Sequence, residues 1–256
     1  MMVVAITAIG YTLASLGANS VIPASIWVFV GIVVGLIGFA HLAVRLLAPG
    51  ADAILLPVAA LLHGIGFVMI TRLDDELAGL QAVWSIVAVA AFTATLWVVQ
   101  RVGDLARYRW TLFFGGTALL LLPLVPGLGS TINGARIWVS VGPLNFQPGE
   151  FAKLALAIFF AAYLADRREL ITTSTFRIGP IRIPELQYIA PILIAWGFSV
   201  LVMVFQRDLG SSLLFFTLFV VMMWVATERI SYLVLGGVLF AGAAYAAWNM
   251  FDHVQT

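Results

Sequence analysis

The chain carries its most informative stretch at Ile132-Asn-Gly-Ala-Arg-Ile-Trp-Val-Ser-Val-Gly-Pro-Leu-Asn-Phe-Gln-Pro-Gly-Glu-Phe-Ala-Lys153. This polar, turn-rich segment lies between two long apolar stretches, and it ends by carrying Glu150 and Lys153 into a hydrophobic helix. A charge at membrane depth costs several kcal/mol unless it faces a polar cavity. The segment therefore predicts a binding site beside a membrane-spanning helix.

The composition of the whole chain identifies the class of protein. Of the 256 residues, 62% are hydrophobic and 10% are charged, and the mean hydropathy is +1.08. Such values are typical of an integral membrane protein and lie far from those of a soluble domain. The chain has no cysteine, which excludes disulfides and thiol catalysis. The scattered histidines predict no metal site, and the absence of a basic run predicts no nucleic-acid partner.

Nine segments are apolar enough to be spanning helices, which need about 20 such residues. We therefore expect an all-α fold, a polytopic bundle of about nine transmembrane helices. The first segment is short and has no basic region before it, so a signal peptide is a poor alternative. The expected helices are 2–16, 26–47, 54–70, 82–99, 110–125, 151–165, 188–206, 209–226 and 232–250.

The distribution of basic residues predicts a cytoplasmic N-terminus, because short cytoplasmic connections retain Lys and Arg. In that orientation the inner connections hold nine arginines and the outer ones three, and the 133–150 segment lies on the outer face. The inner set is Arg45, Arg101, Arg107, Arg109, Arg167, Arg168, Arg177, Arg182 and Arg229, and the outer set is Arg72, Arg136 and Arg207.

The inner connection 166–187 is the longest on its side, and it alternates apolar residues with basic or turn residues around Gly179-Pro180. Two structures fit this pattern. One is a small hairpin, and the other is an interfacial strip whose Arg177 and Arg182 meet anionic lipid headgroups.

Glu150 and Lys153 have two interpretations. Pro148 suits a first helical turn, and a carboxylate just after it meets the positive end of the helix dipole. Lys153 lies three residues on, on the same face, so the two side chains can form a self-neutralising pair. An asparagine would start the helix at lower cost, and this comparison favours a binding site over a purely structural pair.

Arg136 and Trp138 lie in the same segment. A guanidinium binds phosphate with two donors, and an arginine on the outer face runs against the expected charge bias. A phosphate-bearing ligand is therefore favoured for Arg136. Trp138 has two open interpretations, as an anchor at the headgroup level or as a contact to a sugar face.

A second polar run, Gln206-Arg207-Asp208-Leu209-Gly210-Ser211-Ser212, separates two strongly apolar helices. Asp208 is placed to cap the helix that begins at Leu209, with Arg207 neutralising its charge. A carboxylate at a helix junction near a cavity can also orient a donor or a base. Both interpretations remain open from the sequence.

Three runs in this order, Asn-Gly-Ala-Arg-Ile-Trp, Phe-Gln-Pro-Gly-Glu-Phe-Ala-Lys and Gln-Arg-Asp-Leu-Gly-Ser, resemble the SEDS family of cell-wall proteins, which includes RodA, FtsW and SpoVE. The resemblance begins near residue 54. It implies two additional N-terminal helices in 1–50, more typical of RodA-like proteins of actinobacterial type. It also implies a core in 51–256 with the first seven of the family's usual ten helices, lacking the large outer loop and the last three helices.

The resemblance implies a peptidoglycan glycosyltransferase of cell elongation, shape or division, which polymerises lipid II at the outer face of the bacterial cytoplasmic membrane. It implies a class B penicillin-binding protein, a transpeptidase, as partner. The family's proposed catalytic aspartate lies in the outer loop beyond Thr256, so this chain is expected to be an inactive fragment on its own. The positions that match the family's cavity motifs are Arg136, Trp138, Gln147, Glu150, Lys153 and Asp208.

One position departs from the family pattern, since Gly149 stands where serine is usual and loosens the helix start. A divalent cation on the lipid diphosphate is compatible with the resemblance, but no cluster of ligands in the sequence demands one. Two alternatives use the same polar cavity without this chemistry. They are a lipid II flippase and a non-catalytic membrane scaffold that recruits the transpeptidase.

Overall fold

The computed structural model describes residues 2–19, 26–132, 134–141, 144–173, 175–178 and 181–250. Asn133, the Gly179-Pro180 turn, Asp252 and His253 therefore lie outside the described residues. The chain divides into two compact units, Met1–Val102 and Gly103–Thr256. This division follows packing, because the first two helices pack with the next two. The boundary at residue 50, which the family resemblance implies, stays a prediction.

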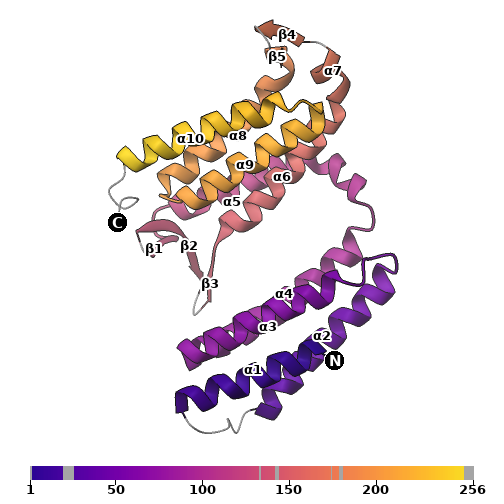
Figure 1. The fold of residues 1–256 in the computed structure, drawn as a ribbon, viewed down its shortest axis with the longest axis vertical. Helices are drawn as coiled ribbons and strands as arrows, with labels where there is room; N and C mark the ends of the chain where they lie inside the picture. The colour runs from indigo at the N-terminus through magenta and orange to yellow at the C-terminus, as the bar shows by residue number, and fades with distance from the viewer. Residues whose placement is uncertain are drawn as a thin grey trace. The chain divides into compact units, whose positions relative to one another are not determined.

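The first unit contains α1 (Met2–Asn19), α2 (Ile26–Leu47), α3 (Leu55–Leu73) and α4 (Asp75–Val98), as Figure 1 shows. Helix α1 crosses α3 at Gly64, where a Cβ atom would lie 2.2 Å from the Thr7 hydroxyl oxygen. Only glycine allows this approach, and small residues at such crossings are typical of helix packing in membranes. Helix α1 is thus an integral part of this unit.

The second unit contains six α-helices and two short 3₁₀ helices (Figure 1). Its elements are η1 (Val102–Tyr108), α5 (Arg109–Leu121), η2 (Leu122–Leu124), α6 (Pro148–Asp166), α7 (Arg168–Thr173), α8 (Leu186–Phe205), α9 (Leu209–Thr227) and α10 (Ser231–Met250).

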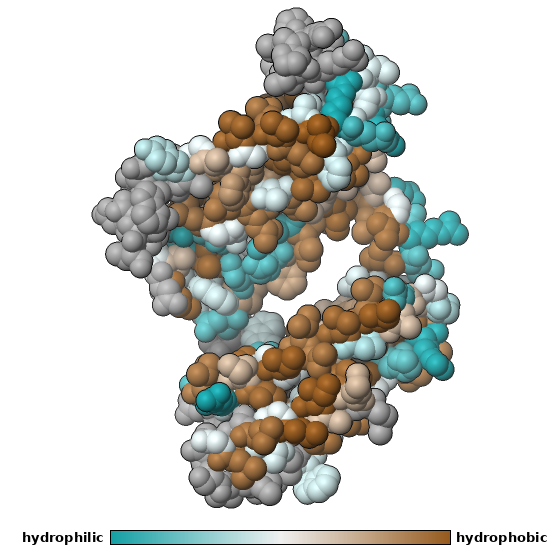
Figure 2. All heavy atoms as spheres, in the orientation of Figure 1, coloured by the Kyte–Doolittle hydropathy of each residue, from teal (hydrophilic) through white to brown (hydrophobic). Residues whose placement is uncertain are grey.

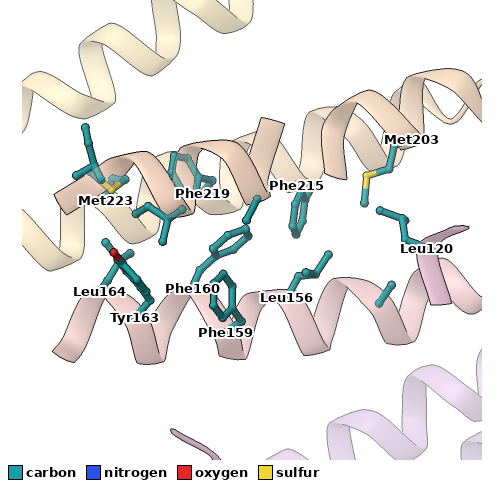
Figure 3. Close-up of a cluster of buried hydrophobic side chains, with 14 of the residues drawn as sticks. Leu120, Leu156, Phe159, Phe160, Tyr163, Leu164, Met203, Phe215, Phe219 and Met223 are labelled. Atoms are coloured by element: carbon teal, nitrogen blue, oxygen red, sulfur yellow. The ribbon is translucent and has the colours of Figure 1, made fainter. Parts of the chain in front are cut away.

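Aromatic side chains hold α6 against α9 in the core of the second unit (Figure 3). The ring centroid of Phe160 lies 5.7 Å from that of Phe215 and 5.5 Å from that of Phe219. Phe160 and Phe215 are fully buried. Aromatic pairs at these separations stabilise packing beyond the area they bury. This contact fixes the relative position of two helices whose first turns carry predicted site residues.

A three-stranded antiparallel sheet fills the connection between α5 and α6. Its strands are β1 (Gly129–Ile132), β2 (Ala135–Val141) and β3 (Leu144–Phe146), in the order β1-β2-β3. Gly129 packs against η2, since a Cβ atom there would lie 1.8 Å from the Pro123 carbonyl oxygen. The described residues of the polar, turn-rich segment that precede α6 therefore lie mostly in this sheet.

The inner connection also contains strands, β4 (Thr175–Ile178) and β5 (Ile181–Pro184), paired antiparallel with Phe176 opposite Ile183. This result selects the hairpin from the two structures that the sequence left open. A contact of its arginines with lipid headgroups stays a prediction.

Helix lengths and surface character confirm an all-α membrane bundle. Within the described ranges, six helices are long and apolar enough to cross a membrane, and two shorter apolar helices, Met2–Gly17 and Ser231–Gly242, accompany them. Apolar side chains cover the helices on the face shown in Figure 2, with hydrophilic ones toward helix ends. The six are Trp27–Leu47, Leu55–Leu73, Leu77–Val98, Pro148–Asp166, Gln187–Phe205 and Leu209–Thr227.

Two helix boundaries differ clearly from expectation. Helix α4 begins at Asp75 rather than at residue 82, because acidic residues stabilise a helix start and Asp74 accepts a hydrogen bond from the Leu77 amide at 3.3 Å. Helix α5 ends at Leu121 rather than at residue 125, because Pro123 has no amide proton to continue the ladder.

Candidate functional site

The candidate site lies at the first turns of α6 and α9. Helix α6 starts after Gln147 with Pro148 in its first turn, and α9 starts after Asp208. The two helices run in the same direction, since Lys153 meets Ser211 near their starts and Arg168 meets Ala226 near their ends. Both positive dipole ends therefore lie at one end of the unit, where they favour an anion.

Lys153 is the central cation of this end. Its ammonium nitrogen lies 2.7 Å from the Glu150 Oε1 atom and 3.4 Å from the Ser211 hydroxyl oxygen. The Lys153 side chain is 13% exposed, whereas that of Glu150 is 56% exposed. The predicted pair is thus present, but it is asymmetric, with the cation held inside and the carboxylate at the surface.

Asp208 caps α9, as one of the two sequence interpretations expected. Its Oδ1 atom accepts a hydrogen bond from the Ser211 amide at 3.0 Å, and its carbonyl oxygen accepts one from the Ser212 hydroxyl at 2.7 Å. Arg207 has a φ of 60° and forms no ion pair with Asp208, so the expected neutralisation is absent from the described residues. The donor that meets the Asp208 carboxylate among the described residues is the Ser211 amide of α9.

Ser211 joins the two helices through both of its polar groups. Its amide donates to Asp208, and its hydroxyl accepts from Lys153. Glu150, Lys153 and Asp208 therefore belong to one continuous set of contacts. Sequence reasoning passed over Ser211, although its position in the second polar run was the available signal.

Arg136 reaches the same region from β2. Its amide donates to the Gln206 carbonyl at 3.0 Å, and its Nη2 atom donates to the Val125 carbonyl at 3.3 Å. Gln206 directly precedes the turn that carries Asp208, so the backbone brings Arg136 beside α9. The structure thus brings four of the six predicted positions together.

Gln147 and Trp138 are less closely tied. Gln147 is the N-cap residue of α6, but its side chain makes no capping hydrogen bond. Trp138 pairs with Ser130 across β1 and β2, and its carbonyl accepts a hydrogen bond from the Ser130 hydroxyl at 3.4 Å. No hydrogen bond or ion pair of the described residues joins Trp138 to Lys153, so a role at the site stays a prediction.

The opposite end of the second unit carries arginines assigned to the inner connections. Arg109 pairs with Asp166 at 2.9 Å, Arg168 pairs with Glu228, and the Arg229 Nη2 atom donates to the Thr172 carbonyl at 2.9 Å. These contacts lie at the C-terminal ends of α6 and α9. The polar site and the arginine cluster therefore occupy opposite ends of the same helices.

An apolar cavity of about 470 Å³ lies within the first unit, between α2, α3 and α4. Its lining includes a polar contact in which His63 Nε2 lies 2.8 Å from the Ser85 hydroxyl oxygen. Because that hydroxyl donates to the Gln81 carbonyl, His63 is the donor to Ser85. None of the predicted site residues lines this cavity.

Acidic and imidazole groups do not gather into a metal site anywhere in the part of the chain that the structure describes, where no group of three or more could hold an ion. The candidate site at the starts of α6 and α9 instead contains cationic and dipolar groups, namely Lys153, Arg136 and two helix N-termini. Such groups bind phosphate-type anions through charge-assisted hydrogen bonds.

Comparison with known proteins identifies relatives along most of the chain. The model of a family described as "Cell cycle protein", FTSW_RODA_SPOVE, matches residues 52–255. Peptidoglycan glycosyltransferase RodA of Mycobacterium tuberculosis is 42% identical over 231 residues, which cover 86% of this chain and 49% of RodA. Stage V sporulation protein E of Bacillus subtilis is 36% identical over 121 residues, covering 47% of this chain and 30% of that protein.

Among solved structures, the crystal structure of the rod shape determining protein RodA from Thermus thermophilus is 25% identical and matches with a TM-score of 0.40. The match covers 84% of this chain and 58% of that one. At this TM-score the superposition supports no structural argument, and the kinship rests on sequence. The chain spans about half the length of the mycobacterial relatives it matches.

Proposed function

We propose a function from one premise: this chain belongs to the FtsW, RodA and SpoVE family of cell cycle proteins. The similar mycobacterial proteins are named peptidoglycan glycosyltransferase RodA. We infer that this chain supplies the substrate-binding helices of such an enzyme. The enzyme polymerises lipid II, a disaccharide-pentapeptide carried on undecaprenyl diphosphate.

The observation that carries this proposal is the placement of Lys153. A lysine that is 13% exposed, held between two helix N-termini by Glu150 and Ser211, presents positive charge at a fixed point. Fixed donors that meet developing negative charge are usually the largest contribution to catalysis. The departing diphosphate of a lipid-linked sugar is the anion that fits this site.

In the proposed reaction, the acceptor hydroxyl oxygen bonds to the anomeric carbon of the donor sugar, and the bond from that carbon to the diphosphate breaks. Lys153 and Arg136 stabilise the charge that the diphosphate gains. Glu150 and Asp208 orient Lys153 and Ser211, and Trp138 lines the entrance. The hydroxyl proton goes to a general base. We assign that role to none of the described acids.

We propose that the site faces outward from the bacterial cytoplasmic membrane and that the N-terminus is cytoplasmic. The arginines at the far ends of α6 and α9 support this orientation, since basic residues are retained on the cytoplasmic side. The proposed partner is a class B penicillin-binding protein, which would link the new glycan strands on the same side of the membrane.

The test is polymerisation of lipid II by the full-length protein, reconstituted with its partner in proteoliposomes. Glycan strands should form with the natural protein and decrease with Lys153→Ala or Glu150→Ala. Undiminished glycan from both variants would reject the roles given to this pair. Movement of lipid II across the bilayer without glycan would favour a flippase, and neither activity would favour a scaffold for the transpeptidase.

A further inference from the structure

Gln206 is a buried polar residue outside the set of residues that bind substrate in the proposed reaction. It is 3% exposed, and its side-chain Nε2 atom donates to the Leu120 carbonyl at 2.6 Å across 86 residues of sequence. Its own carbonyl accepts from the Arg136 amide at 3.0 Å. One residue therefore joins the end of α5, the start of β2 and the end of α8.

Each of these bonds satisfies a group that a helix end leaves without a partner. Leu120 lies in the last turn of α5, where carbonyls lack a following turn, and Pro123 has no amide proton to offer. The Gln206 carbonyl stands at the C-terminal end of α8 in the same situation. An unpaired carbonyl away from water is costly, so these contacts hold the three segments in one arrangement.

These hydrogen bonds and the backbone from Leu120 to Val125 form a closed ring of contacts. Gln206 binds Leu120, Arg136 binds Gln206, and the Arg136 guanidinium binds the Val125 carbonyl at 3.3 Å, just beyond η2. The two residues that follow Gln206 form the left-handed turn and the Asp208 cap. Gln206 thus lies between the two parts of the site, with Arg136 on one side and the contacts of Asp208, Ser211 and Lys153 on the other.

We propose that Gln206 is a positioning residue that sets Arg136 at a fixed place relative to Lys153, so that both cations meet the same diphosphate. The proposal rests on the proposed function for its substrate. Gln206 itself does not touch the substrate. It acts through the backbone of β2, which carries Arg136.

The first test needs no substrate. Gln206→Met keeps length and burial but removes the amide donor, and Gln206→Asn keeps an amide that is too short to reach Leu120. Hydrogen exchange of the Arg136 amide, measured on the full-length protein in nanodiscs, should be faster in both variants. The matched control is Ser199→Ala, because Ser199 is also buried in α8 but bonds only to the Ala195 carbonyl of its own helix.

The second test is the KM for lipid II in the reconstituted polymerase. Both Gln206 variants should raise KM about 10-fold, the effect of a displaced charge-assisted contact. The kcat should change less. Ser199→Ala should stay within about twofold of the natural protein, because the hydrogen bond it removes lies within α8 and joins no other segment. A purely structural residue would lower the amount of folded enzyme without raising KM.

The two measurements distinguish a positioning role of Gln206 from a role in folding alone. The proposal would be overturned if, in both variants, the exchange rate of the Arg136 amide and the KM for lipid II equalled those of the natural protein. Failure of both variants to fold, with Ser199→Ala intact, would also overturn it, because Gln206 would then belong to the fold alone. Faster exchange in a protein that never polymerises lipid II would leave the positioning role and remove the proposed function.

Discussion

The two ends of the second unit both carry ion pairs, yet they differ in how the charges are buried. At the starts of α6 and α9, Lys153 is largely buried while its partner Glu150 is exposed. At the far ends of the same helices, Arg168 and Glu228 have side chains that are 53% and 76% exposed. The formation of an ion pair therefore does not distinguish the two ends, whereas burial of the cation does.

This difference matches the two roles that we propose, in which exposed charges orient the protein and the buried charge binds a ligand. Exposed pairs contribute about 0–1 kcal/mol to stability, so ion pairing adds little at the arginine end. The proposed cytoplasmic orientation would account for the basic residues there. A buried ammonium at membrane depth costs free energy that one hydrogen bond to Ser211 and one exposed carboxylate offset only in part. The proposed binding of a diphosphate at this end would account for the charge.

The largest expected effect follows from removing the buried charge. Lys153→Met keeps the length of the side chain and should reduce lipid II polymerisation about 100-fold or more, the usual effect of losing a preorganised donor. The thermal midpoint should fall little, because the buried charge also carried a desolvation cost. Product gels and a melting curve on the same preparation measure both quantities, and retained activity would remove the distinction between the two ends.

Asp208 gives an intermediate effect that separates capping from charge. Asparagine caps helices as well as aspartate, so Asp208→Asn should keep the thermal midpoint but lower activity about 10-fold. Asp208→Ala should lose the cap as well, about 1 kcal/mol of stability. Equal activity of the asparagine variant and the natural protein would restrict Asp208 to the capping role.

Ser211 should give a smaller effect. Ser211→Ala removes the hydroxyl that accepts from Lys153 but leaves the amide that binds Asp208. A single hydrogen bond of this kind corresponds to about 3–10-fold in activity. Steady-state kinetics at saturating and limiting lipid II provide the measurement, and an unchanged kcat/KM would show that Lys153 does not depend on Ser211.

The smallest effect is expected at the arginine end. Arg168→Gln removes an exposed pair with Glu228 and should change polymerisation less than about twofold, with a stability change below about 1 kcal/mol. This variant is the matched control for Lys153→Met, since each removes one paired cation from an end of the same helices. A large loss of activity in Arg168→Gln would show that polymerisation depends on the cations at both ends, and it would contradict the distinction between them.

The sequence predicted the membrane bundle and its main helices, because long apolar runs leave few other structures in a bilayer. The pairing of Glu150 with Lys153 and the cap at Asp208 were each among the alternatives that the sequence offered, because both depend on spacing within one helix. The hairpin at β4 and β5 was one of two alternatives. These features are all local in sequence.

The sequence did not predict features that depend on contacts between distant segments. The bond from Gln206 to Leu120 joins residues that are 86 positions apart and whose proximity follows only from packing. The sheet at β1–β3 was also missed, although its strands are neighbours in the sequence. The early end of α5 was also missed, although Pro123 was a visible signal. The burial of Lys153 relative to Glu150 arises from the contact of α6 with α9, which no spacing rule contains.

A charge swap tests the central claim most directly. The double variant Glu150→Lys with Lys153→Glu keeps an ion pair in the first turn of α6 but moves the cation to the exposed position. Binding of lipid II to the full-length protein in nanodiscs would be compared with that of the natural protein. We expect the swapped protein to fold and insert but to lose binding at least 10-fold, since a displaced charge-assisted contact to a phosphate is strong. Natural affinity in the swapped protein would contradict the account, because the pair would then serve only to neutralise the helix start.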